Sequence, residues 1–211
     1  MKKLLVLTAL AVAVLGKVAF AADFPITAKI PAATTVNFIV SEVTPGPTPV
    51  FVAHPSFNLD FSTAGTGMSY DTANGIWVGS RFFAIDLATV DGTGTPAPGT
   101  FGSISFGYAG QVVPAGQPAT EGLNKRATLT AVRVNSDASE TQLRNGAVGN
   151  TFAALTNADV VGGFLRVYVG LATGETTGTP PVPVVPGSVP FTNGDKPGTY
   201  TGTLTITATL I

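Results

Sequence analysis

The sequence offers few side chains for catalysis. It has a single histidine, His54, and no cysteine, which excludes disulfide scaffolds, zinc fingers, iron–sulfur clusters and cysteine nucleophiles. A serine hydrolase mechanism would depend on His54 alone, and no G-x-S-x-G nucleophile elbow is present. His54 follows Val52 and Ala53 and precedes Pro55, which is a loop context. We therefore expect a surface or packing role for it.

The acidic residues do not form a recognisable catalytic pair. A glycosidase needs two carboxylates on facing elements. Asp60 and Asp86 lie within strand-like runs, but Asp60 alternates with Leu59 and Phe61, which places it on the solvated face of a strand. We predict that the protein is not an enzyme.

Glycine-rich and acidic turns account for the remaining candidate ligand sites. Residues 65–67 and 91–94 lack the lysine and the following helix of a phosphate-binding loop. Asp71 with Asn74, and Asn193 with Asp195, carry oxygen ligands that suit calcium, but not at EF-hand spacing. Turn chemistry explains both pairs, so we predict neither a metal nor a cofactor.

Three aromatic residues suggest a second kind of site. Trp77, Phe82 and Phe83 would form a sugar-stacking platform if they were exposed. Because all three lie in apolar, strand-like runs, we expect a role in the core instead.

The composition limits the class of protein. Charged residues make up 11% of the 211-residue chain and hydrophobic residues 45%, whereas an ordinary soluble domain has roughly 25% charged residues. Disorder driven by high charge is therefore excluded. A formal net charge of −1 gives no electrostatic footprint for nucleic acid.

The N-terminus has the pattern of a secretory signal. Lys2 and Lys3 precede an apolar run at residues 4–16, and residues 19–21 (AFA) form an A-x-A cleavage site. We predict a signal peptide at residues 1–21. Its removal takes away three of the 11 basic residues and leaves 8 against 12 acidic ones, a net charge of −4.

The rest of the chain has the pattern of an antiparallel β protein. Residues 199–211 alternate threonine with mostly apolar residues, which predicts a half-buried strand. Similar alternation predicts strands near residues 34–41, 57–61, 76–87, 104–108 and 165–171, separated by glycine and proline turns. Only residues 137–144 resemble a short helix, and residues 178–190 form a proline-rich loop.

The segment after the cleavage site is an amphipathic strand of its own. Phe24, Ile26, Ala28 and Ile30 alternate with Pro25, Thr27 and Lys29. A new N-terminus is poorly ordered unless it is tied down. In a generic β-sandwich this segment would be the first strand of its own domain. Because residues 34–41 can fill that place, the N-terminal strand is free to reach into another molecule.

Two segments resemble the chaperone–usher pilins, and most closely their cysteine-free alternate class of colonisation-factor fimbrial subunits. Residues 26–30 (ITAKI) resemble the exchangeable donor strand of those pilins. Residues 197–206 (PGTYTGTLTI), with a Gly-x-Tyr-x-Gly entry into an alternating strand, are similar to their closing strand. The order of signal, donor strand, β-strands and closing strand matches over the whole chain. The long proline-rich loop has no counterpart.

The resemblance implies a fold and a mechanism. It implies an all-β, immunoglobulin-like antiparallel β-sandwich that is incomplete and is completed by a donor strand from a neighbouring subunit. The domains would be the signal peptide (1–21), the donor strand and linker (22–33) and the pilin domain (34–211). The donor residues would be Phe24, Ile26, Ala28 and Ile30. The acceptor groove would comprise Val36, Phe38, Val40, Tyr200, Leu204, Ile206, Ala208 and Leu210.

The expected function is that of a structural subunit of an extracellular adhesive pilus. The chain would pass through the periplasm, bind a periplasmic chaperone and an outer-membrane usher, and join identical subunits head to tail in a surface fimbrium; a host or surface receptor is a further expected partner. The alternative is a secreted β-sandwich binding module, such as a minor tip adhesin or a carbohydrate-binding domain. A tip adhesin normally carries an additional lectin domain, for which we find no room.

Overall fold

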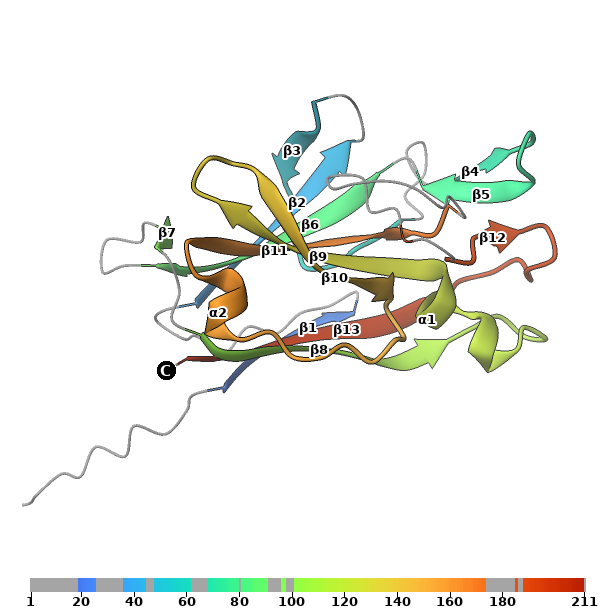
Figure 1. Ribbon diagram of the computed structural model, residues 1–211. Coiled ribbons are helices and arrows are strands. Elements are labelled where there is room, and N and C mark those ends of the chain that lie inside the picture. Colours follow the sequence, from blue (N-terminus) through green and yellow to red (C-terminus); the bar gives the residue numbers. More distant parts are fainter. Residues whose placement is uncertain are drawn as a thin grey trace, which may run out of the picture.

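A computed structural model describes residues 19–25, 36–44, 48–61, 68–79, 81–90, 96–97, 101–173, 185 and 188–210. The fold is all-β with antiparallel strands, as the sequence predicts (Figure 1). Three sheets form the described part of the chain. No helix within it is long and apolar enough to cross a membrane.

The largest sheet has the strand order β10-β9-β11-β6-β2-β3, with β7 paired to β6. Its central strands are long apolar runs because they are buried on both faces. The strands of this sheet are β2 (Val36–Thr44), β3 (Val50–Ala53), β6 (Phe82–Val90), β7 (Pro96–Ala97), β9 (Ala127–Asn135), β10 (Glu140–Ala147) and β11 (Gly163–Leu171).

Two smaller sheets complete the fold. One has the order β1-β13-β8 and faces the large sheet; the other, β12-β5-β4, lies at one end of the molecule (Figure 1). Their strands are β1 (Ala19–Pro25), β8 (Phe101–Val112), β13 (Thr201–Leu210), β4 (Met68–Asp71), β5 (Ile76–Gly79) and β12 (Phe191–Thr192). The short helices are η1 (Ala119–Glu121), α1 (Leu123–Arg126) and α2 (Asn157–Val160).

The main hydrophobic core lies between the large sheet and the β1-β13-β8 sheet. Strands β6, β9 and β11 contribute alternate residues to it, and Phe101, Ile104 and Ile206 contribute from the facing sheet. The alternation predicted for the C-terminal strand is confirmed. The even-numbered residues Gly202, Leu204, Ile206 and Ala208 are buried, while the intervening threonines are partly exposed.

The outer face of the large sheet carries a second apolar cluster. Phe82 and Tyr168 are its large members and are almost completely buried. Beside them, Arg166 donates to both carboxylate oxygens of Asp86, at 2.6 and 2.8 Å. The guanidinium lies 4.4 Å from the ring centroid of Phe51 on β3. These aromatic rings and the Arg166–Asp86 ion pair cover the outer face of β6 and β11, which is why both faces of these strands carry apolar residues.

Two local predictions were wrong. Residues 137–144 are not helical: a turn joins β9 to β10, with Ala138 at φ 64° and the backbone N–H of Ser139 donating to Asp137 Oδ1 at 3.0 Å. Asn145 and Gly146, which follow that segment, lie inside β10. Residues 57–61 form no strand, although Leu59 is buried in the core. In both cases local pattern was overridden by tertiary pairing and packing.

Candidate functional site

The edge of β13 pairs with the N-terminal strand β1. The register is antiparallel and runs from Ala19 opposite Thr209 to Pro25 opposite Thr203. On its other side β13 pairs with β8, so β1 is the outer strand of this sheet (Figure 1). The predicted cleavage bond after Ala21 therefore falls inside β1. Three of the seven paired residues precede it and four follow it.

The structure brings most of the predicted acceptor residues together. Phe38 and Val40 of β2 share one core with Leu204, Ile206 and Ala208 of β13, and none of the five is more than 6% exposed. The other three predicted acceptor residues are described only in part or lie beside the strand. Val36 begins β2 and Leu210 ends β13, but only their backbones are described, and Tyr200 immediately precedes β13.

The predicted donor residues are placed only in part. Phe24 lies in β1, opposite Leu204. Ile26, Ala28 and Ile30 lie outside the described residues. The predicted boundary at residue 21 falls inside β1, and the one at residue 33 lies outside the described residues.

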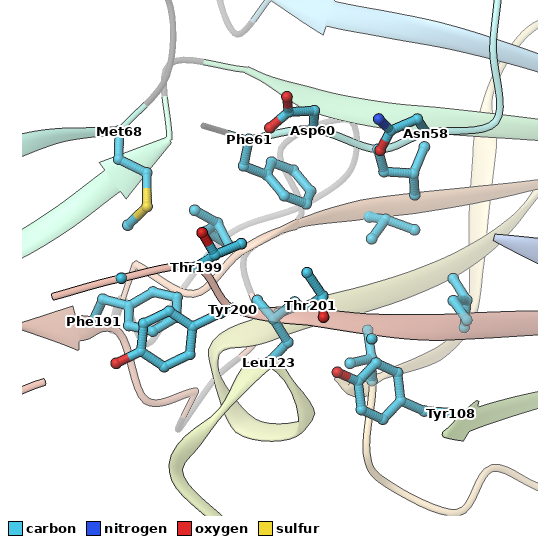
Figure 2. A pocket seen from close by; sticks show the side chains of 18 residues that line it. Asn58, Asp60, Phe61, Met68, Tyr108, Leu123, Phe191, Thr199, Tyr200 and Thr201 are labelled. Carbon is cyan, nitrogen blue, oxygen red and sulfur yellow. The ribbon is translucent and has the colours of Figure 1, made fainter. Parts of the chain in front are cut away.

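A cavity of about 310 Å³ opens where β13 begins, beyond the residue opposite Pro25 (Figure 2). Side chains from the 58–61 segment, α1, β8, β11 and β12 meet around it, and its wall is mainly apolar. The lining residues are Asn58, Leu59, Asp60, Phe61, Met68, Tyr108, Leu123, Ala127, Val148, Val169, Leu171, Phe191, Gly198, Thr199, Tyr200, Thr201, Gly202 and Leu204.

Gly202 and Tyr108 shape the floor of this cavity. A Cβ atom on Gly202 would lie 1.9 Å from Oη of Tyr108, so the ring of Tyr108 occupies the place that a side chain at 202 would need. Tyr108 Oη donates to Gln111 Oε1 at 3.3 Å. Burial raises the pKa of Tyr108 to about 12. The hydroxyl therefore stays neutral and donates throughout the physiological pH range.

The Gly-x-Tyr-x-Gly motif thus has a physical basis at each position. Gly198 has a φ of 141°, and a Cβ there would lie 2.8 Å from Cγ of Pro114. Tyr200 packs edge-on against Phe191, with ring centroids 4.8 Å apart, and its hydroxyl donates to the carbonyl oxygen of Lys196 at 2.7 Å. The motif fixes the path by which the chain enters β13.

A buried ion cluster holds the segment that leads into β13. Arg126 donates to Asp195 Oδ1 at 2.9 Å and to Glu121 Oε2 at 3.1 Å. It also donates to the carbonyl oxygen of Pro190 at 2.8 Å. The side chains of Arg126 and Asp195 are each only 8% exposed. Sequence reasoning missed this cluster, because nothing in the local pattern marks Arg126 as buried.

The candidate catalytic residues have separate structural contacts. Nε2 of His54 lies 3.0 Å from the carbonyl oxygen of Asn58, and its ring packs edge-on against Phe83 at 5.2 Å. Asp60 lines the cavity, whereas Asp86 is paired with Arg166 on the large sheet. Among the described residues no cluster of three or more histidine and acidic side chains forms a metal site.

The aromatic candidates divide between core and surface. Phe82 and Phe83 are buried, at 3% and 0% exposure, which confirms the expected core role for both. Trp77 is only partly buried.

Asn58 has a buried Oδ1 with no hydrogen-bond donor in the described part of the chain.

Comparison of the chain with protein-family models, with curated proteins and with solved structures finds no match in any of the three.

Proposed function

We propose that this chain is a structural subunit of an extracellular adhesive pilus that polymerises by donor-strand exchange in a chaperone–usher pathway. The observation that carries the proposal is the pairing of β13 with the chain's own N-terminal strand, at an edge that opens into an apolar cavity. In the proposed filament, the N-terminal strand of the next subunit takes the place of β1. The fold is then an immunoglobulin-like β-sandwich that this strand completes.

The register supports this geometry. Phe24 lies opposite Leu204. A donor strand that continued in the same register would bring its next alternate positions, 26 and 28, opposite Gly202 and Tyr200. Both of these residues line the cavity. Directly opposed residues of an antiparallel pair share a face of the sheet, so Phe24, Ile26 and Ala28 would follow the buried face of β13 into that space.

Burial and hydrogen bonding would stabilise an inserted donor strand. Burial of a large apolar side chain contributes about 1.5–3 kcal/mol, and each inter-strand hydrogen bond adds about 0.5–1.5 kcal/mol. Phe24, Ile26 and Ile30 would together offset the cost of ordering the strand. A head-to-tail interface that does not close generates a filament. In a chain without cysteine, this exchange supplies the stability that a disulfide would otherwise provide.

The proposed partners follow from the same edge. An unpaired apolar edge strand is an aggregation hazard, so a periplasmic chaperone would lend a strand to β13 before assembly, and an outer-membrane usher would exchange it for that of the next subunit. This is β-strand addition.

The test compares two charge substitutions in adjacent donor positions. Ile26→Asp would place a carboxylate on the inserted face, and we expect filaments to be lost while export continues. Thr27→Asp places the same charge on the opposite face, and we expect normal filaments. Negative-stain microscopy scores filaments, and immunoblotting of periplasmic extract scores export. Normal filaments from Ile26→Asp would overturn the proposal.

A further inference from the structure

A second cavity, of about 250 Å³, lies beside the small sheet at the β12 end of the molecule. It shares Met68, Phe191, Gly198 and Tyr200 with the larger cavity, but Trp77, Asn193, Asp195 and Lys196 line only this one. In the register of β1 the predicted donor strand runs along β13, whereas Trp77, Asn193 and Lys196 of this cavity lie outside β13.

One wall of this cavity is part of an aromatic row. Trp77 is the cross-strand partner of both Tyr70 and Phe191. The rings of Tyr70 and Trp77 are 5.2 Å apart, and Phe191 leads on to Tyr200. Phe191 is buried, whereas Trp77 and Tyr200 keep part of their surface exposed. The partly exposed rings of Trp77 and Tyr200 therefore both line this cavity.

The other wall is a polar turn that is held rigidly. Asp195 accepts four hydrogen bonds: from Gln117 and Arg126 at Oδ1, and from the backbone N–H and hydroxyl of Thr192 at Oδ2. Its carboxylate is thus fully used in fixing the turn. Asn193 and Lys196 lie on the same turn and are exposed. Neither the Asn193 amide nor the Lys196 ammonium has a hydrogen-bond partner within the described residues.

We propose that this cavity binds a neutral saccharide. An aromatic ring has a negative face, which suits the C–H face of a sugar ring. The Asn193 amide both donates and accepts hydrogen bonds and the Lys196 ammonium donates, which suits a cluster of hydroxyl groups. One lysine beside a carboxylate makes a poor site for an anion, and the polar wall makes a poor site for a purely apolar ligand. Small-molecule sites combine such apolar walls with a few fixed polar groups. This inference does not depend on the proposed filament.

The single tryptophan provides the readout. Trp77 is the only tryptophan in the chain, so its fluorescence reports on this cavity. Full-length exported protein is titrated with galactose, mannose, N-acetylglucosamine and their disaccharides, and with sialic acid as an acidic comparison. We expect a saturable change in fluorescence with at least one neutral sugar. We expect Asn193→Ala to weaken that binding about tenfold, as loss of a good hydrogen bond would.

The matched control is Asn150→Ala, which removes an exposed asparagine from a turn that does not line this cavity and should leave binding unchanged. Asn193→Ala removes no side-chain hydrogen bond within the described residues and should fold normally, as thermal melting would verify. The proposal is overturned if no neutral sugar gives a saturable signal, if sialic acid binds more tightly than any neutral sugar, or if Asn193→Ala binds as the wild type does. Filament formation by Ile26→Asp, scored separately, bears only on the polymer function.

Discussion

On the inner face of the β13 sheet, the Tyr108 side chain fills the space that a side chain at Gly202 would need. A Cβ atom added to Gly202 would lie 1.9 Å from the hydroxyl oxygen of Tyr108. A glycine in a strand interior normally weakens the strand, and it is retained where another group approaches closely. The glycine is therefore a packing requirement of the cavity floor.

We predict that Gly202→Ala lowers the free energy of unfolding by about 1–3 kcal/mol, because an added carbon in a filled space forces neighbouring groups to shift. Urea denaturation measures the change. The control is Gly107→Ala in β8, where an added Cβ meets nothing within 4 Å and stability should hardly change. Equal effects of the two substitutions would refute the packing explanation.

The same tyrosine makes stability depend on alkaline pH. Burial raises the pKa of Tyr108 to about 12 from its ordinary value of 10.0. The folded state therefore retains the proton more strongly than the unfolded state does. The stabilisation is fully present below pH 10 and is lost as pH rises through 12. We expect Tyr108→Phe to flatten the fall in stability between pH 10 and 12, measured by urea denaturation at each pH. An unchanged slope would show that another group controls it.

At the scale of elements, Arg126 connects α1 to the segment that leads into β13. Removing one partner of a buried ion pair leaves the other charge uncompensated. We predict that Arg126→Ala lowers the free energy of unfolding by about 3–5 kcal/mol, because Asp195 would then be buried without its cation. Urea denaturation provides the measurement.

Its neighbour Lys125 is a matched control. Lys125 also pairs with Glu121, but its side chain is 45% exposed. Exposed pairs contribute little, so Lys125→Ala should change stability by less than about 1 kcal/mol. If both substitutions lower the free energy of unfolding equally, the Arg126 cluster does not stabilise the segment that leads into β13.

Elements with one buried face were predictable from the sequence. Strand β13 alternates because only one of its faces meets the core, and period-2 alternation follows directly from that. Strand β10 was missed because it is an edge strand, with Arg144, Asn145 and Gly146 in its second half. Its pairing with β9 is a tertiary fact that no local window contains.

The cavity was less predictable than the strand beside it. Tyr200 and Leu204 were predicted to line the acceptor groove that the pilin resemblance implies, and both line this cavity. Asn58, Leu123 and Phe191 also line the cavity, but they come from segments far apart in the sequence. Only the packing of the 58–61 segment, α1 and β12 against β13 brings them together.

At the scale of the whole molecule, the absence of cysteine permits a direct test of where the strand beside β13 comes from. Asp23 lies opposite Thr205, and opposed residues in an antiparallel pair are close enough for a disulfide. We predict that the double variant Asp23→Cys, Thr205→Cys gives a ladder of covalent oligomers from oxidised filaments on a non-reducing gel. A single monomer band from such filaments would mean that β1 stays within its own chain.

The control pairs Asp23→Cys with Gly107→Cys. Gly107 lies on β8, opposite Thr205 on the far side of β13. Two strand spacings, about 9.5 Å, then separate the two Cα atoms, which is too far for a disulfide. Crosslinking in this control would mean that the register differs from the one described.

For a chain that is exported as the sequence predicts, the position of β1 sets an order of events during biogenesis. The strand extends from Ala19 to Pro25, so it contains the bond that the sequence predicts to be cut during export. A protease must draw its substrate into an extended, accessible conformation, and a bond inside a paired strand is withheld from it. In the export pathway that the sequence predicts, cleavage would therefore come before β1 pairs with β13. A precursor that folded before cleavage would lose its signal peptide slowly, so the rate of folding would limit the rate of cleavage.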